Sequence, residues 1–275
     1  MNLRAQKASL TRNSTEQRKR PMLRTLLAAT AFAALASAAP AQDFDFSKMS
    51  APQKAQFGDA VRDYLMANPQ VLVEAINELE SKQRAQQADN DAQLIQTNAK
   101  DIFEDGHSWV GGNPDGDITI VEFTDYKCTY CKKAFGEVND LLKNDGNIRF
   151  IIKEFPILGQ QSELGSRFAV AVQQLDGDAA YEKVHNALMS MRGDLTVGSL
   201  SKLAKDQGLD ADAILKRMNE DSVSDVLRAN YQLAQRMAIS GTPGFVIGDQ
   251  LLRGYAPEAA MAQIVAEERK AKADK

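Results

Sequence analysis

The sequence predicts an α/β fold in which a small sheet is interrupted by a long helical insertion. Three observations predict this class. Residues 118–124 alternate as a strand, residues 132–142 have a helical pattern, and residues 147–155 form a second strand that ends before a proline. A strand, a helix and a second strand in this order make a βαβ unit. Residues 160–238 then show only helical periodicity, so we expect an insertion before the sheet resumes.

The composition is that of a globular protein with an acidic body. The chain has 275 residues, of which 44% are hydrophobic and 25% are charged, enough for one or two domains with a core. Its net charge is −4, and residues 1–41 contribute +6 from seven basic residues and one acid, which leaves −10 for the remainder. An acidic body argues against nucleic-acid binding. After residue 41, no apolar stretch is long enough to span a bilayer.

Residues 1–41 are predicted to be a signal peptide. A basic region precedes the alanine-rich apolar run 26–39, and Ala39-Pro-Ala41 is a small-x-small cleavage site that predicts cutting before Gln42. The basic region is long for a signal peptide, so translation starts at either Met1 or Met22. A membrane anchor is the weaker alternative because the apolar run is short. Export would place the two cysteines in an oxidising compartment.

Residues 42–105 are predicted to be mostly helical and separate from the sheet. A helix that begins near residue 50 is interrupted by Asn68-Pro69, where asparagine can cap and proline fits a first turn. A second helix follows, polar residues dominate 80–93, and an apolar stripe resumes at 94–103. A helix with a narrow apolar stripe and no core of its own needs a partner, either another chain or the rest of its own.

One stretch of this segment resembles a known family. Val61-Arg-Asp-Tyr-Leu-Met-Ala-Asn-Pro-Gln-Val-Leu-Val-Glu-Ala75 is similar to the N-terminal region of ScsC-type proteins, named for suppression of copper sensitivity. The resemblance implies that residues 42–105 form a homo-oligomer, for which a trimer is one candidate.

The predicted central strand carries an acid among apolar neighbours. Residues 106–117 are rich in glycine, asparagine, aspartate and proline, which indicates a turn or hairpin leading into the strand. In the strand, Ile118, Ile120 and Glu122 share one face. We therefore expect Glu122 to be a buried carboxylate. The alternative is a half-exposed glutamate at a strand end.

Cys128-Thr-Tyr-Cys131 contains the only two cysteines of the chain and opens the predicted helix. A helix N-terminus has unpaired N–H groups and a partial positive charge, so a thiolate there is stabilised and its pKa falls. The three-residue step puts both sulfurs on one side of the first turn, within bonding reach. We expect Cys128 to be the exposed nucleophile and Cys131 the resolving thiol.

Two other uses of the cysteines are weaker. A structural zinc site needs four ligands, and beyond two cysteines the chain offers only His107 and His185, far apart in sequence. A structural disulfide across so small a ring removes little chain entropy. Redox chemistry is therefore favoured. His185 lies on the apolar stripe of a predicted helix and is assigned no role.

The remaining elements complete the sheet. Helical stripes in the insertion are marked by Phe168, Val172 and Leu175; Tyr181, Val184, Leu188 and Met191; Leu200, Leu203 and Ala204; Ile214, Leu215 and Met218; and Val223, Leu227, Leu233 and Met237. Gly241-Thr-Pro-Gly244 follows, then a hairpin with a turn at 248–249. Residues 257–270 are predicted to be the closing helix.

Three motifs together resemble the DsbA family of thiol:disulfide oxidoreductases: residues 112–131, Lys153-Glu-Phe-Pro-Ile157 and Gly241-Thr-Pro-Gly-Phe-Val246. The resemblance implies a thioredoxin-like fold over residues 106–275, with the helical insertion at about 160–238. It implies exchange through a mixed disulfide, with a cis bond before Pro243. It also implies that Thr242 and Pro243, with Thr129 and Tyr130, contact the substrate, and that Glu122 relays protons for Cys131.

The resemblance further implies a periplasmic protein that acts on exported proteins with thiols or disulfides and is served by a membrane redox partner of unknown identity. It implies no organic cofactor and no metal. Oxidases of the family carry Pro-His between the cysteines, whereas this chain has Thr129-Tyr130, so oxidase and isomerase or reductase remain open. The alternative is a periplasmic copper-binding or copper-holding protein that uses the soft cysteine pair for Cu(I).

Overall fold

The structure is a computed structural model, and it describes residues 46–274. The predicted signal peptide, its cleavage site and the choice between Met1 and Met22 lie outside the described residues. The chain divides into two units, one ending at Tyr64 and the other beginning at Leu65. Among the helices described, none combines the length and the hydrophobicity that crossing a bilayer requires.

The first unit contains the short 3-10 helix η1 (Phe46–Lys48) and most of α1 (Ala51–Ala67). Ser50 begins α1 as a cap, because its backbone N–H and its hydroxyl both donate to Oε1 of Gln53, at 2.8 and 2.9 Å. No residue of α1 is buried. Its apolar side chains are therefore available for contacts outside the described chain.

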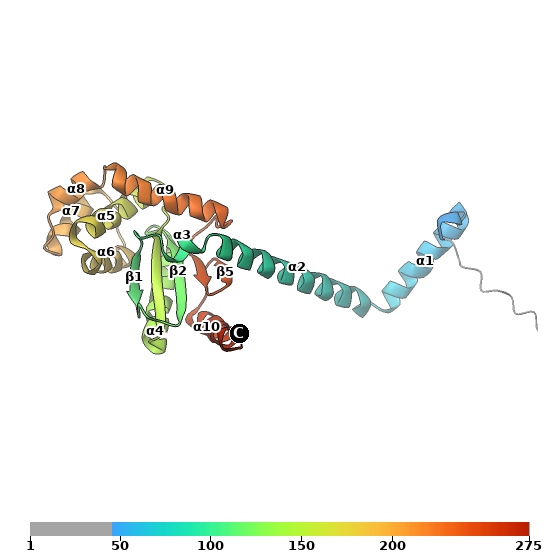
Figure 1. Cartoon of the computed structure of the whole chain (residues 1–275). Helices are drawn as coiled ribbons and strands as arrows, with labels where there is room; N and C mark the ends of the chain where they lie inside the picture. The colour runs from blue at the N-terminus through green and yellow to red at the C-terminus, as the bar shows by residue number, and fades with distance from the viewer. Residues whose placement is uncertain (1–45, 275) are drawn as a thin grey trace, which may run out of the picture. The chain divides into compact units, whose positions relative to one another are not determined.

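The second unit is built on a five-stranded sheet in the order β1-β3-β2-β4-β5 (Figure 1). The strands are β1 (Trp109–Gly112), β2 (Ile118–Thr124), β3 (Ile148–Glu154), β4 (Gly244–Ile247) and β5 (Gln250–Arg253). Only β2 and β3 are parallel, and α4 (Thr129–Asp145) connects them. The predicted βαβ unit is therefore confirmed, and the predicted central strand has the observed bounds.

The segment before β2 is a turn at residues 114–115, which is one of the two forms predicted for residues 106–117. Residues 106–117 contain β1, which pairs with β3 and not with β2, so no hairpin leads into the central strand. Two glycines explain the path. Gly112 has a φ of 64°, and a Cβ there would lie 2.4 Å from the carbonyl oxygen of Ile148. A Cβ on Gly116 would lie 2.5 Å from the backbone nitrogen of Arg149. The chain thus turns tightly against the start of β3.

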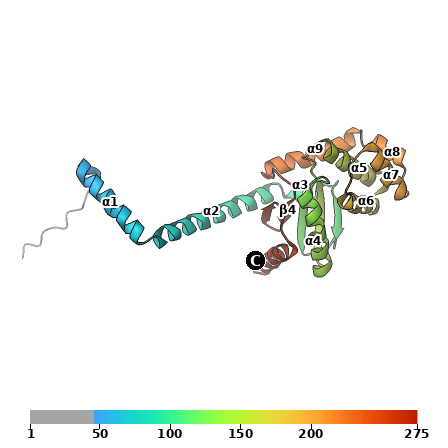
Figure 2. The same ribbon diagram turned by 180° about the vertical axis from the view of Figure 1, so that it is seen from behind.

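Helices cover both faces of the sheet. The insertion between β3 and β4 comprises α5 (Gln160–Asp176), α6 (Asp178–Ser190), α7 (Val197–Asp206), α8 (Ala211–Arg217) and α9 (Asp221–Arg236), and α10 (Glu258–Ala273) closes the chain. Figure 2 shows α4 in front of the sheet. One core joins α4, α6 and α10 to the face that carries Ile118 and Ile120, and a second core joins α9 to the face that carries Val121 and Phe123.

The end of the predicted N-terminal segment packs on the sheet. It forms α2 (Gln70–Thr97) and α3 (Ala99–Phe103). Between residues 51 and 90 no side chain is buried, but Ile95 and Ile102 lie in the second core. Asp91 also binds the guanidinium of Arg253 through both of its oxygens, at 2.7 and 2.8 Å. Residues 91–103 therefore pack against their own sheet, while the domain boundary at 105 stays a prediction.

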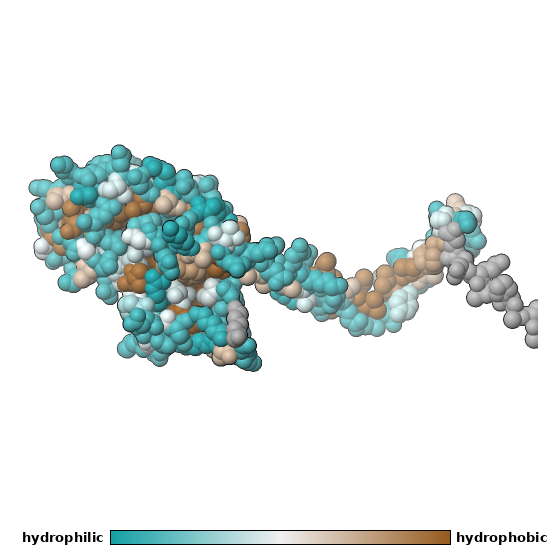
Figure 3. Space-filling model, viewed as in Figure 1, coloured by the Kyte–Doolittle hydropathy of each residue, from teal (hydrophilic) through white to brown (hydrophobic). Residues whose placement is uncertain are grey.

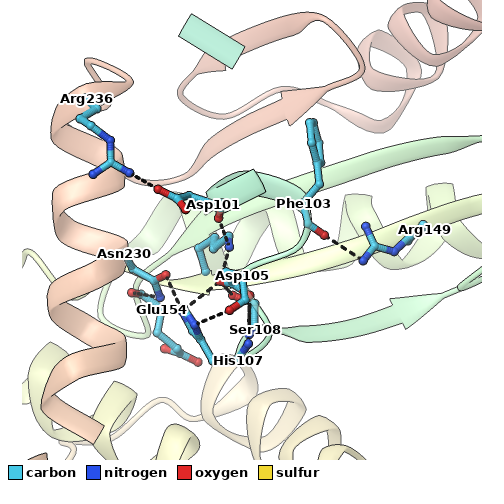
Figure 4. A network of polar contacts seen from close by, with 10 residues as sticks. Asp101, Phe103, Asp105, His107, Ser108, Arg149, Glu154, Asn230 and Arg236 are labelled. Carbon is cyan, nitrogen blue, oxygen red and sulfur yellow. Dashed lines mark hydrogen bonds and ion pairs between the residues drawn. The ribbon is translucent and has the colours of Figure 1, made fainter. Parts of the chain in front are cut away.

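A polar network fixes α3 and the loop after it (Figure 4). Lys153 of β3 is fully buried; its Nζ donates to the carbonyl oxygen of Asp101 at 2.8 Å and pairs with the carboxylate of Asp105. Nε2 of His107 lies 2.9 Å from that carboxylate, and Arg236 of α9 donates to the carboxylate of Asp101 at 2.6 Å. These bonds supply the charged partners that a buried lysine requires.

Candidate active site

The two cysteines lie at the start of α4. Cys128 is the N-cap residue, and its Sγ accepts a hydrogen bond from the backbone N–H of Cys131 at 3.3 Å. Both cysteines are free thiols. Cys128 is 6% exposed and Cys131 is 0% exposed. The strand, turn and helix that the sequence predicts are confirmed. The expectation that Cys128 is exposed is wrong, because the helix start and the loop at Thr242 bury it, although Cys128 remains the more accessible of the two sulfurs.

The surroundings of the two thiols separate their acidities. The Cys131 thiol donates to the Cys128 sulfur, and hydrogen bonds from the Thr242 side chain and from the backbone N–H groups of Cys131 and Tyr130 add to this effect. Together they lower the pKa of Cys128 to about 6 despite its partial burial. The same bond, burial and the nearby Glu122 carboxyl raise the pKa of Cys131 far above its ordinary value. At neutral pH the pair therefore holds one thiolate, on Cys128, and one proton, on Cys131.

Glu122 is buried as predicted, at 3% exposure on β2. Burial raises the pKa of its carboxyl to about 8, and the negative charges of Cys128 and Glu154 act in the same direction. It also lines a cavity of about 450 Å³, together with Phe135 of α4 and His185 of α6. Glu122 is therefore mostly protonated at neutral pH, close enough to the cysteines to affect their charge.

A second loop meets Cys128 from far along the chain. The Thr242–Pro243 peptide bond is cis, as the DsbA resemblance implies. The Cys128 sulfur lies 3.2 Å from the carbonyl oxygen of Thr242, across 114 positions of sequence, and donates a hydrogen bond to it when Cys128 is in its thiol form. The structure thus brings together Cys128, Cys131, Thr242 and Pro243, which the sequence assigns to one site.

The residues between the cysteines form part of the surface. Thr129 is exposed, and Tyr130 is 61% exposed. The ring centroid of Tyr130 lies 6.1 Å from that of Tyr255, whose ring is also covered by Nζ of Lys133 at 4.1 Å. An aromatic and cationic surface therefore lies beside the Cys128 thiol.

Sequence reasoning missed four buried polar residues around the loop before Cys128. The carboxylate of Asp125 is fully buried and accepts hydrogen bonds from three backbone N–H groups, those of Lys127, Ile157 and Leu158. The other three are Tyr126, Glu154 and His185, which contact one another. One signal was available: in the strand 148–154, Glu154 shares the parity of Phe150 and Ile152, as Glu122 shares that of its apolar neighbours.

Within residues 46–274, no group of three or more histidine, cysteine, aspartate or glutamate side chains is arranged to hold a metal ion. The two histidines serve separate networks: His107 binds Asp105, and His185 lies 3.0 Å from the hydroxyl of Tyr126.

The cysteine pair lies at a helix start beside a cis-proline, and the sequence that contains these features matches a known family. The model of the DSBA-like thioredoxin domain matches residues 119–266, more than half of the chain. The chain belongs to the DsbA-like thioredoxin family. It is therefore a thiol-disulfide oxidoreductase with a thioredoxin-like fold, a helical insertion and a helical segment before it. The model of the copper resistance protein ScsC N-terminal domain matches residues 53–86, so both resemblances found in the sequence are confirmed.

Several solved structures are similar to the chain. A thioredoxin-like oxidoreductase from Silicibacter pomeroyi DSS-3 has 36% sequence identity and a TM-score of 0.59, and the match covers 62% of this chain and 97% of that one. A linker-deletion variant of ScsC from Proteus mirabilis has 26% identity and a TM-score of 0.60, over 82% of this chain and 99% of that one.

Two curated relatives with different names are also similar to part of this chain. Disulfide bond formation protein D of Bacillus subtilis (strain 168) is 24% identical over 171 residues, which cover 58% of this chain and 77% of that protein. Na(+)/H(+) antiporter NhaA 1 of Salinispora arenicola (strain CNS-205) is 26% identical over 157 residues, covering 56% of this chain. The chain spans only 24% of the length of that antiporter.

Proposed function

We propose that this DsbA-like protein is a periplasmic thiol:disulfide interchange protein that acts on exported proteins. The observation that carries the proposal is the position of Cys128, whose sulfur caps the start of α4, accepts the backbone N–H of Cys131 at 3.3 Å and lies beside the cis-proline loop; this position favours a thiolate on Cys128 and a proton on Cys131. A thiolate is the species that attacks a disulfide, and a protonated, buried partner does not compete with it. The predicted signal peptide supports export.

The exchange follows from this arrangement. The Cys128 thiolate attacks one sulfur of a substrate disulfide, the other substrate sulfur leaves with the electron pair, and a mixed disulfide forms. Cys131 then loses its proton, attacks Sγ of Cys128 and releases the first substrate sulfur as a thiolate. Oxidation of a substrate dithiol is the reverse of these steps. Glu122 exchanges the proton of Cys131, and an extended substrate pairs with the backbone of Thr242 next to Pro243.

The oligomer is the second part of the proposal. Large apolar side chains are exposed along the segment that matches the ScsC N-terminal model: Phe57, Val61, Tyr64 and Met66 on α1, and Leu72, Val73, Ile76 and Leu79 on α2. Figure 3 shows apolar surface on each of these helices. An exposed stripe of this kind marks a protein interface. We propose a homo-oligomer through residues 42–105, in which several Cys128 sites reach one client and favour isomerisation over oxidation.

Turnover and metal retention test the proposed function. We expect the mature protein to catalyse insulin reduction and refolding of a scrambled multi-disulfide protein, because the dithiol form carries the reactive thiolate. A Cys128→Ser variant should lose both activities, and a Cys131→Ser variant should stall at the mixed disulfide. Retention of Cu(I) without turnover in either assay would instead support the copper-holding alternative. Oxidation of reduced clients without isomerisation would support the oxidase.

A further inference from the structure

Two buried carboxyls lie on one face of the sheet behind the cysteines. Glu122 of β2 and Glu154 of β3 are each 3% exposed. In the parallel register, Glu122 lies opposite Ile152 and Thr124 lies opposite Glu154. Glu122 and Glu154 are therefore diagonal neighbours with the same parity, and such neighbours lie roughly 7–8 Å apart. Thr124, which lies two residues after Glu122 on β2 and directly opposite Glu154, is fully buried.

This part of the core is polar where the rest of the face is apolar. Among the described residues, Oε1 of Glu122 and Oε2 of Glu154 are buried and accept no well-formed hydrogen bond, although the hydroxyls of Thr124 and Ser166 lie near enough to Glu122 and Glu154, respectively, to lower their pKa values. Buried polar atoms without partners are rare and call for an explanation. Two acids in one weakly screened region also interact strongly, so the charge of each affects the protonation of the other.

Glu154 is held in place from three sides. Its Oε1 accepts hydrogen bonds from the hydroxyls of Tyr126 and Tyr181, both at 2.6 Å. Two phenol donors on one oxygen favour the carboxylate form. His185 lies 3.0 Å from the Tyr126 hydroxyl, and burial lowers its pKa to about 3, so it adds no charge. Asn230 of α9 donates to the carbonyl oxygen of Glu154 at 3.1 Å (Figure 4).

We propose that Glu154 is a positioning residue for the exchange reaction, whose carboxylate, held by Tyr126 and Tyr181, keeps Glu122 protonated and ready to serve Cys131. The inference rests on the proposed function and deepens it. When a substrate thiolate attacks Sγ of Cys128 in the oxidised enzyme, the bond to Cys131 breaks and Cys131 leaves with the electron pair. The proton of Glu122 moves to Cys131, and Glu122 becomes a carboxylate. The reverse step returns that proton.

The ionisation properties of the pair agree with this geometry. Burial raises the pKa of Glu154 to about 7 and that of Glu122 to about 8, and the two phenol donors stabilise the carboxylate of Glu154 but not that of Glu122. The ionisable groups that face the two carboxyls or share the cavity at Glu122 are Asp125, Tyr126, Cys128, Cys131, Lys143, Tyr181, Glu182 and His185. All of these except Tyr181 are unchanged in the variants compared below.

The first experiment reads the protonation of Glu122 directly. Carbon-13 NMR of side-chain carboxyls is recorded against pH on the reduced, mature protein, and the Glu122 signal is assigned by its loss in Glu122→Gln. In Glu154→Gln we expect the midpoint of Glu122 to fall by about one pH unit. Tyr181→Phe removes one phenol from Glu154 without touching the cysteines and should lower it by a smaller amount. An unchanged midpoint in a folded variant overturns the inference.

The second experiment reads the reaction. The rate at which the oxidised protein oxidises a dithiol peptide is measured from pH 6 to 10. In Glu154→Gln, the pH at which the rate falls on the alkaline side should drop by the same number of pH units as the NMR midpoint of Glu122. A purely structural role would instead lower the rate equally at every pH. If the titration midpoint of Glu122 moves and the pH–rate profile does not, Glu122 does not supply the proton of Cys131, and that part of the inference is overturned. The dithiol activity of Cys128 and Cys131, and with it the proposed function, would survive either failure.

Discussion

At the scale of single residues, the chemistry depends on the difference between two thiols three positions apart. We expect iodoacetamide to label Cys128 first, with a rate that rises through pH 6, because the pKa of Cys128 is lowered from its ordinary value of 9.0 to about 6. The lowered pKa of Cys128 also stabilises the reduced fold: this contribution grows between pH 6 and pH 9 and is lost as the pH falls through 6, whereas the raised pKa of Cys131 opposes it above pH 9. Mass spectrometry locates the label. First labelling of Cys131, or a midpoint near 9, would contradict these roles.

The residues of the site differ in how far the sequence could reveal them. Cys128 and Cys131 follow from their spacing at a helix start, and Glu122 follows from strand parity, because both signals are local. Tyr126 and His185 have no such signal, and the strand parity of Glu154 indicates its burial but not its partners. Tyr126 meets Glu154 across 28 positions and His185 across 59, so their roles exist only once the insertion has folded against the sheet. A buried histidine on an apolar stripe looks the same in sequence whether or not it binds a tyrosine.

At the scale of elements, hydrophobic periodicity predicts whether a segment forms a helix or a strand, but it does not predict which other element that segment pairs with or packs against. The bounds of β2 and the helical nature of the insertion follow from their own patterns. The pairing of β1 does not, because it depends on the tight approach of Gly112 and Gly116 to β3. The polar stretch 80–93 continues α2 without an apolar stripe, since it is rich in strong helix formers and its start carries two i,i+4 ion pairs, Glu78–Lys82 and Glu80–Arg84.

The loop between β2 and α4 depends on one buried acid. Asp125→Ala should lower the free energy of unfolding by about 3 kcal/mol or more, because three backbone N–H groups lose a charged acceptor. Asp115→Ala, at an exposed position, is the matched control and should change it by less than about 0.5 kcal/mol. Urea unfolding of both variants measures the difference. A loss below about 1 kcal/mol for Asp125→Ala would show that the loop is held by other contacts.

At the scale of the whole molecule, the structure determines where the N-terminal segment can be cut. Removing residues 42–105 would also remove Ile95 and Ile102 from the second core and Asp91 from Arg253. Such a deletion should cost the redox unit about 4 kcal/mol or more, since each lost isoleucine side chain leaves a cavity. A deletion of residues 42–86, where the match to the ScsC N-terminal model ends, keeps these contacts. The shorter deletion therefore separates oligomerisation from stability.

We expect the mature protein without residues 42–86 to be a monomer that keeps insulin reduction, loses isomerase activity and is oxidised more readily, because no neighbouring Cys128 site then shares its client. In the full-length protein, Ile76→Glu should weaken assembly by placing a charge in the exposed apolar stripe, whereas Ser81→Glu, at an exposed position on the opposite face of the same helix, should leave it intact. Light scattering gives the mass, and refolding of a scrambled protein gives the activity. A monomeric full-length protein, or a deletion that isomerises as fast, would refute the oligomer and favour the oxidase.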